Sequence, residues 1–123
     1  MKPDIYEQHD KAFANVSAYV VANADGNRVA TVAFKFPRDG ASRLYCYVHW
    51  LGVPMVRGFA GGYGYDKQTA ALANAIAKLI NAAWDYERDR ETLDAFLKAA
   101  GHDGGKRWND ALHDAGFTVW QAV

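Results

Sequence analysis

Cysteine is nearly absent from this sequence, and neither sign of charge is in excess. The single Cys46 excludes an internal disulfide and a zinc site built from several cysteines. Lysine and arginine together number 14, as do aspartate and glutamate, so no global charge attracts nucleic acid or an anionic membrane. The same balance argues against a mimic of DNA, which needs an excess of carboxylates. Any basic patch on this protein must therefore be local.

Long apolar runs are also missing. No segment approaches the ~20 consecutive apolar residues that a membrane-spanning helix needs. The N-terminal stretch MKPDIYEQHD is polar and lacks the apolar run of a signal peptide. We therefore expect a cytoplasmic protein with no membrane partner. A chain of 123 residues has the usual size of one domain, so residues 1–123 are expected to form a single domain.

Residue patterns that carry catalysis or bind metals are missing as well. The four histidines are scattered without a metal-binding spacing: His9, His49, His102 and His113. Cys46 and His49 share an expected strand but point to opposite faces, so the imidazole cannot activate the thiol. The two serines, Ser17 and Ser42, stand in no nucleophile motif. We expect no metal site and no enzymatic activity.

Extended runs of β-branched and aromatic residues predict an antiparallel meander. The segments VSAYVVAN and RVATVAFKF, between Asn15 and Phe36, flank Asp25-Gly26, a strong hairpin signal. RLYCYVHW, residues 43–50, is the third predicted strand. MVRGF, residues 55–59, is a short fourth strand or an irregular edge.

Beyond the glycine-rich loop, apolar residues recur at intervals of three and four, which predicts an amphipathic helix. One unbroken helix over residues 67–100 would be ~50 Å long, too long for so small a domain, so we expect a break near residues 87–91. Asp66 is the predicted N-cap of the helix and Gly101 a C-terminal cap. A short helix around Trp108 to Ala115, ended by Gly116, and a strand over residues 117–123 follow.

The predicted fold is therefore α+β: an antiparallel meander sheet of three to four strands, covered by a long helix, with two further short helices and a C-terminal strand. Alternation assigns one residue set to the core: Ala30, Val32, Phe34, Phe36, Leu44, Cys46, Val48 and Trp50. The opposite face receives Tyr45, Tyr47 and His49 with Tyr19, Thr31 and Lys35. This face is either an exposed binding surface or is covered by the N-terminal segment or the C-terminal helices.

The glycine-rich loop "FAGGYGYDK" does not fit a nucleotide cofactor. A Walker loop ends in Gly-Lys-Ser or Gly-Lys-Thr, whereas Lys67 here lies between Asp66 and Gln68. The dinucleotide fingerprint also fails, because no third glycine follows Gly62-Tyr63-Gly64 at the required spacing. We expect no cofactor, and a tight entry into a capped helix explains the loop.

Three antiparallel strands followed by "GYGYDKQTAALANAIAKL" resemble the second half of the double-stranded RNA-binding domain, over residues 28–80. In that family a glycine-containing turn leads into a helix that opens with lysines and continues with alanines, and Lys67, Ala70 and Ala75 fall near matching places. The resemblance implies contact with RNA or DNA phosphates. This chain departs from the family at Gln68 and Ala71, where more lysines are expected, which implies a smaller phosphate contribution.

The segments "FKFPRDGASRLYCYVHWLGVPMVRG" and "GYGYDK" resemble parts of small accessory proteins of phages and conjugative elements. Such proteins are often antagonists of host defence, including anti-CRISPR and anti-restriction proteins, which dock on a nucleoprotein complex. The resemblance implies a phage protein or other mobile-element product that acts in the host cytoplasm.

Our leading hypothesis is a non-enzymatic binding protein of this kind, an inhibitor that occupies a host protein or nucleoprotein surface. The alternative is a domain that binds double- or single-stranded nucleic acid, and a small enzyme of unknown class is third. Aromatic and arginine side chains are typical of interface hot spots. The predicted partner-binding residues are Tyr45, Tyr47 and His49 on the sheet, with Arg38, Arg43, Arg57, Tyr63, Tyr65 and Lys67 in the loops.

Overall fold

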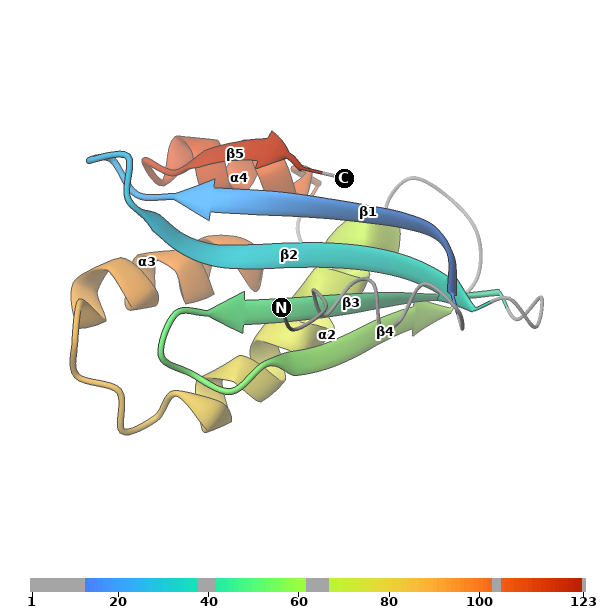
Figure 1. Ribbon diagram of the computed structural model, residues 1–123, viewed down its shortest axis with the longest axis horizontal. Coiled ribbons are helices and arrows are strands. Elements are labelled where there is room, and N and C mark those ends of the chain that lie inside the picture. The colour runs from blue at the N-terminus through green and yellow to red at the C-terminus, as the bar shows by residue number, and fades with distance from the viewer. Residues whose placement is uncertain (1–12, 38–41, 62–66, 103–104, 123) are drawn as a thin grey trace, which may run out of the picture.

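The computed structural model describes residues 13–37, 42–61, 67–102 and 105–122. Its centre is an open antiparallel sheet of five strands, in the spatial order β4-β3-β2-β1-β5 (Figure 1). The strands are β1 (Phe13–Ala22), β2 (Arg28–Pro37), β3 (Arg43–Trp50), β4 (Val56–Gly61) and β5 (Thr118–Gln121). The predicted meander and the returning C-terminal strand, which pairs with β1, are both confirmed.

The turn between β1 and β2 is built by its own side chains. The Asn23 side-chain oxygen accepts hydrogen bonds from the main-chain N–H groups of Asp25 and Asn27, both at 3.0 Å. Gly26 has φ 84°, a conformation that a residue without Cβ adopts at little cost. The hairpin predicted from Asp25-Gly26 is therefore confirmed, and it fixes the pairing of the first two strands.

In the described part of the chain, three helices cover one face of the sheet: α2 (Lys67–Ala82), α3 (Arg90–Ala100) and α4 (Trp108–Asp114) (Figure 1). The break that helix length requires lies between Ala82 and Arg90, so it begins earlier than the expected residues 87–91, and Arg90 and Glu91 already belong to α3. There the Arg90 Nη1 group donates hydrogen bonds to the carbonyl oxygens of Ala83 at 2.8 Å and Tyr86 at 3.2 Å, which satisfies acceptors in the connection that follows α2. Gly101 caps α3 as predicted, whereas the predicted N-cap Asp66 lies outside the described residues. No described helix is both long and apolar enough to cross a bilayer.

The face of the sheet beneath the helices forms the core, as alternation predicts. Val32, Phe34, Cys46, Val48 and Trp50 are all buried there. Trp108 attaches α4 to this core. Its main-chain N–H donates to the Thr69 hydroxyl oxygen at 3.1 Å, and its indole Nε1 donates to the Gln68 side-chain oxygen at 3.0 Å. The last helix is thereby joined to the first turn of α2.

The prediction for Tyr19 is wrong. We expected its ring on the face opposite the helices, but Tyr19 pairs with Val32 across β1 and β2, and directly paired residues point to the same face. Its ring centroid lies 4.9 Å from that of Trp108 and 6.1 Å from that of Phe34. A shift of register between Ala14 and Ser17 accompanies this pairing. Tyr19 is therefore partly buried against the core on the helix side of the sheet, away from the face to which alternation assigned it.

Helix α2 approaches the main chain of the sheet closely at Gly58 of β4. A Cβ atom placed on Gly58 would lie 2.2 Å from the main-chain nitrogen of Ala75 and 2.7 Å from its Cα. Glycine and alanine face each other at this point, and only these small residues permit so short a separation. The contact sets the position of α2 over the edge of the sheet.

We expect Gly58→Ala to destabilise the fold by about 3 kcal/mol, because the added methyl group overlaps backbone atoms that have no room to move. Urea unfolding followed by circular dichroism measures the change. Gly61→Ala on the same strand is the matched control, since a Cβ there meets nothing within 4 Å. Equal midpoints for the two variants would show that the contact tolerates a side chain.

Candidate functional site

The structure brings five of the nine predicted binding residues onto one face of the sheet, opposite the helices. They are Arg43, Tyr45, Tyr47 and His49 on β3, and Arg57 on β4. Lys67 begins α2 and therefore lies in the helix layer. Arg38, Tyr63 and Tyr65 lie outside the described residues.

Part of this face is buried and part of it is exposed. Tyr47 is only 5 % exposed and forms a small cluster with Ala18 and Ala33. Lys35 is 0 % exposed, and its ammonium nitrogen lies 4.9 Å from the centroid of the Tyr47 ring. His49, by contrast, is exposed. The C-terminal helices do not bury the centre of this face, because they lie on the other side of the sheet.

Four side chains nearer the β4 edge form a mixed cationic and aromatic cluster, which we call the arginine-tyrosine patch: Arg43, Tyr45, Arg57 and Phe59. The Arg57 Cζ atom lies 5.1 Å from the centroid of the Tyr45 ring, and the Arg43 Cζ atom lies 5.9 Å from it. Both distances are within the range of a cation–π interaction. The Phe59 ring centroid is 5.9 Å from that of Tyr45, with the planes tilted by 44°.

Phe59 is the member of the patch that sequence reasoning missed. It pairs directly with Tyr45 across β3 and β4, and 48 % of its surface is exposed. Its position two residues after Arg57 was the available signal, because residues at that spacing share a face of a strand. Large exposed aromatic rings beside arginines are typical of binding surfaces.

Charge is segregated around the patch although the whole chain is neutral. No aspartate or glutamate occurs from Gly40 to Tyr65, nor from Lys67 to Trp84. These segments include β3, β4 and α2, and they carry Arg43, Arg57, Lys67 and Lys78. The local basic region that the neutral composition leaves possible is therefore present at this edge of the sheet.

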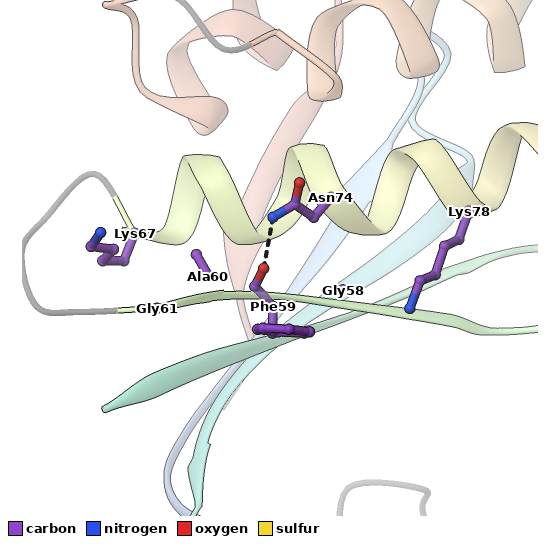
Figure 2. Close-up of a pocket in the computed structure, with 7 residues that line it drawn as sticks. All are labelled: Gly58, Phe59, Ala60, Gly61, Lys67, Asn74 and Lys78. Carbon is purple, nitrogen blue, oxygen red and sulfur yellow. Dashed lines mark hydrogen bonds between the residues drawn. The ribbon is translucent and has the colours of Figure 1, made fainter. Parts of the chain in front are cut away.

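A groove of about 490 Å³ runs between α2 and the outer strand β4 (Figure 2). Its lining consists of Gly58, Phe59, Ala60 and Gly61 from β4, with Lys67, Asn74 and Lys78 from α2. The Asn74 side-chain amide spans the groove and donates a hydrogen bond of 2.7 Å to the carbonyl oxygen of Phe59. Since Phe59 also belongs to the arginine-tyrosine patch, the groove and the patch are continuous.

A second hollow, of about 560 Å³, lies between α3 and α4. Alanines line much of it, and Lys98, His102 and Lys106 add positive charge. Lys106 is bonded to Asp114, which raises the pKa of the lysine and lowers the pKa of the carboxyl group. The charge of Lys106 is thus already neutralised by Asp114, so this hollow is a weaker candidate for an anionic ligand than the groove beside β4.

The described residues offer little to an enzymatic mechanism. No group of three or more histidine, cysteine, aspartate or glutamate side chains among them is arranged to hold a metal ion. Cys46 is fully buried and His49 is exposed on the opposite face, as the alternation of β3 predicts. Burial raises the pKa of the Cys46 thiol well above its usual value, so the reactive thiolate is disfavoured.

Comparisons of the chain with protein-family models, with curated proteins and with solved structures find no match.

We expect Cys46 to resist Ellman's reagent in the native protein at pH 8 and to react fully in denaturant, because the buried group stays a neutral thiol. Cys46→Ala supplies the blank. The folded pKa is raised, so this group's contribution to stability is complete below the unfolded pKa and is lost as the pH rises above it. Rapid labelling of the native protein, without loss of its circular dichroism, would contradict the assignment.

Proposed function

We propose that this chain is a non-enzymatic binding protein that occupies an acidic surface of a protein or nucleoprotein complex through the arginine-tyrosine patch. The observation that carries the proposal is the placement of two guanidinium groups against the Tyr45 ring beside an exposed phenylalanine. Arginine and aromatic side chains supply most of the binding free energy in many protein interfaces.

The position of these side chains on adjacent strands supports the proposal. Arg43 and Tyr45 belong to β3, and Arg57 and Phe59 belong to β4. Paired strands hold their side chains at fixed spacing, so little conformational entropy is lost when a partner binds. Contacts of arginine with a neighbouring ring also restrict its rotamers before binding.

The absence of carboxylates from β3, β4 and α2 supports an acidic partner surface. Positive charge at the patch complements such a surface at contact distance and disfavours basic competitors. A neutral net charge limits attraction to polyanions in general. Specificity then depends on the shape and spacing of the patch.

The role in a cell that we propose follows from the resemblance to mobile-element accessory proteins. A small protein that covers a functional surface inhibits a larger machine without chemistry of its own. On this basis the proposed target is a host defence complex, and the proposed action is that of an anti-CRISPR or anti-restriction inhibitor.

Direct binding of nucleic acid is the second candidate, and one observation favours it. The cations Arg43 and Arg57 lie beside the aromatic rings of Tyr45 and Phe59. Proteins that bind single-stranded nucleic acid combine cations, which contact the phosphate backbone, with aromatic rings, on which the bases stack. The resemblance of residues 28–80 to a double-stranded RNA-binding domain points to the same class of ligand.

The first experiment is a pull-down from bacterial lysate with the tagged wild-type protein, with and without nuclease, compared with Arg57→Ala and Phe59→Ala. We expect a defined protein complex that survives nuclease, and about tenfold weaker binding of the recovered partner by each variant in biolayer interferometry. Both side chains are exposed, so the variants should melt like the parent. Tyr47→Ala is unsuitable because that side chain is buried.

Arg88→Ala is the matched control, since this exposed arginine lies on the connection between α2 and α3. It should bind the partner normally. If Arg57→Ala and Phe59→Ala also bind normally, the patch is not the binding surface.

The nucleic-acid alternative predicts a steep dependence on salt. If about four cations replace counterions, affinity for an oligonucleotide should fall roughly 100-fold between about 50 and 200 mM salt. Arg57→Ala should lower the slope of log affinity against log salt by about one unit. Fluorescence anisotropy with labelled single- and double-stranded oligonucleotides measures both quantities, and a flat response would remove this candidate.

A further inference from the structure

The outer strand β4 has one strand neighbour among the described residues, because it pairs with β3 at the end of the sheet order. In such an edge strand, alternate residues turn their main-chain N–H and C=O groups away from the sheet. An extended peptide that adds beside an edge strand uses these groups for affinity. The groove between α2 and β4 lies along this edge (Figure 2).

The groove is lined on one side by main chain. Gly58, Phe59, Ala60 and Gly61 are consecutive residues of β4, and two of them carry no side chain. The Asn74 amide donates to the Phe59 carbonyl oxygen, so this acceptor points out of the sheet, and an added strand either displaces the amide or shares the oxygen through its second lone pair. A backbone N–H of an added segment requires the same kind of acceptor.

Two lysines mark the ends of the groove. Lys67 and Lys78 project from opposite ends of the lined stretch of α2 (Figure 2). They are separated by about 16 Å along a helix that rises 1.5 Å per residue, which equals about five residues of extended chain. No lining residue is acidic. The charge pattern therefore complements a short strand with carboxylates near both ends.

We propose that this groove binds an extended acidic segment of the partner protein, which adds to β4 as a further strand of the sheet. Its carboxylates pair with Lys67 and Lys78, and its main chain bonds to the outer edge of β4. The inference rests on the proposed function, because it names the part of the partner that lies next to the arginine-tyrosine patch. Phe59 links the two contacts, since it lines the groove and belongs to the patch.

The spacing of charge favours a peptide over a nucleic-acid strand at this groove. A strand of duplex DNA carries one charge for about every 3.4 Å of helix axis, so several phosphates would face the uncharged stretch between the lysines. A peptide places carboxylates at the ends and neutral side chains between them.

A competing role for the lysines is protection of the edge strand β4 against aggregation, which is a common role of lysines on edge strands.

The test uses a capped peptide of about six residues, with glutamate at each end and alternating threonine and valine between. Added to ¹⁵N-labelled protein, it should shift the amide signals of Arg57 to Gly61 and slow hydrogen exchange on β4. The same peptide with glutamine at its ends should bind about tenfold more weakly, because both ion pairs are lost. A peptide N-methylated at alternate residues should lose binding, since it cannot form the ladder of main-chain hydrogen bonds.

The Lys67→Gln/Lys78→Gln variant should bind the glutamate peptide about tenfold more weakly than wild type. Lys98→Gln/Arg88→Gln removes the same charge from exposed positions away from β4 and should bind normally. Equal binding of the N-methylated peptide, no shift on β4 at millimolar peptide, or preference of the groove for an oligonucleotide would each overturn the inference. Either of the first two results would favour the competing role, in which Lys67 and Lys78 protect the edge strand β4 against aggregation.

The two proposals fail separately. If the recovered partner binds the Lys67→Gln/Lys78→Gln variant normally but is lost with Arg57→Ala, the patch remains and the strand addition is wrong. If the lysine variant loses the partner while Arg57→Ala and Phe59→Ala retain it, the groove remains and the patch is wrong.

Discussion

The close approach of α2 to β4 at Gly58 and Ala75 determines the geometry of the candidate site. A side chain at Gly58 would overlap the Ala75 backbone, so this pair sets how near the helix lies to the sheet edge. At this separation Asn74 reaches the Phe59 carbonyl oxygen, and the two lysines of α2 lie beside the edge rather than far above it. A bulkier pair would lift the helix and open the groove. The same contact thus determines both the packing of α2 on the sheet and the position of the side chains that line the groove.

The two faces of the sheet differ in how they are packed and in how far they are exposed. Beneath the helices, Trp108 contacts Phe34 and Tyr19 and hydrogen-bonds to the start of α2, so one residue joins α4 to α2 and to the core. This packing makes the strands a rigid support. On the opposite face the centre is buried around Tyr47, whereas the edge at Arg57 and Phe59 is exposed. A rigid support beneath an exposed edge is what a preformed binding surface requires.

Local patterns were sufficient to predict most of the fold but less of the site. The segment RLYCYVHW forms β3 over the expected residues, and the Asp25-Gly26 hairpin and the break before Arg90 are confirmed, because turn chemistry, alternation and helix length are local properties. The face of Tyr19 depends on which residue it pairs with in β2, and the place of Phe59 beside Tyr45 depends on the register between β3 and β4. Both are set by contacts between distant segments, which periodicity does not encode. The sequence left open whether the face of Tyr45, Tyr47 and His49 is exposed or covered, and the structure divides it, because Tyr47 is buried at the centre whereas His49 is exposed.

Neutral composition conceals a division of charge within the molecule. The carboxylates of Asp85, Glu87, Asp89, Glu91 and Asp94 follow one another around the start of α3, whereas β3, β4 and α2 contain none. A balanced total therefore limits only the field at long range, which salt screens over about 10 Å, and leaves the field at contact distance to the local arrangement. A partner would feel little attraction until it is near the β4 edge, and there it would meet arginines held against aromatic rings. Recognition by such a surface depends on fit at short range more than on steering from afar.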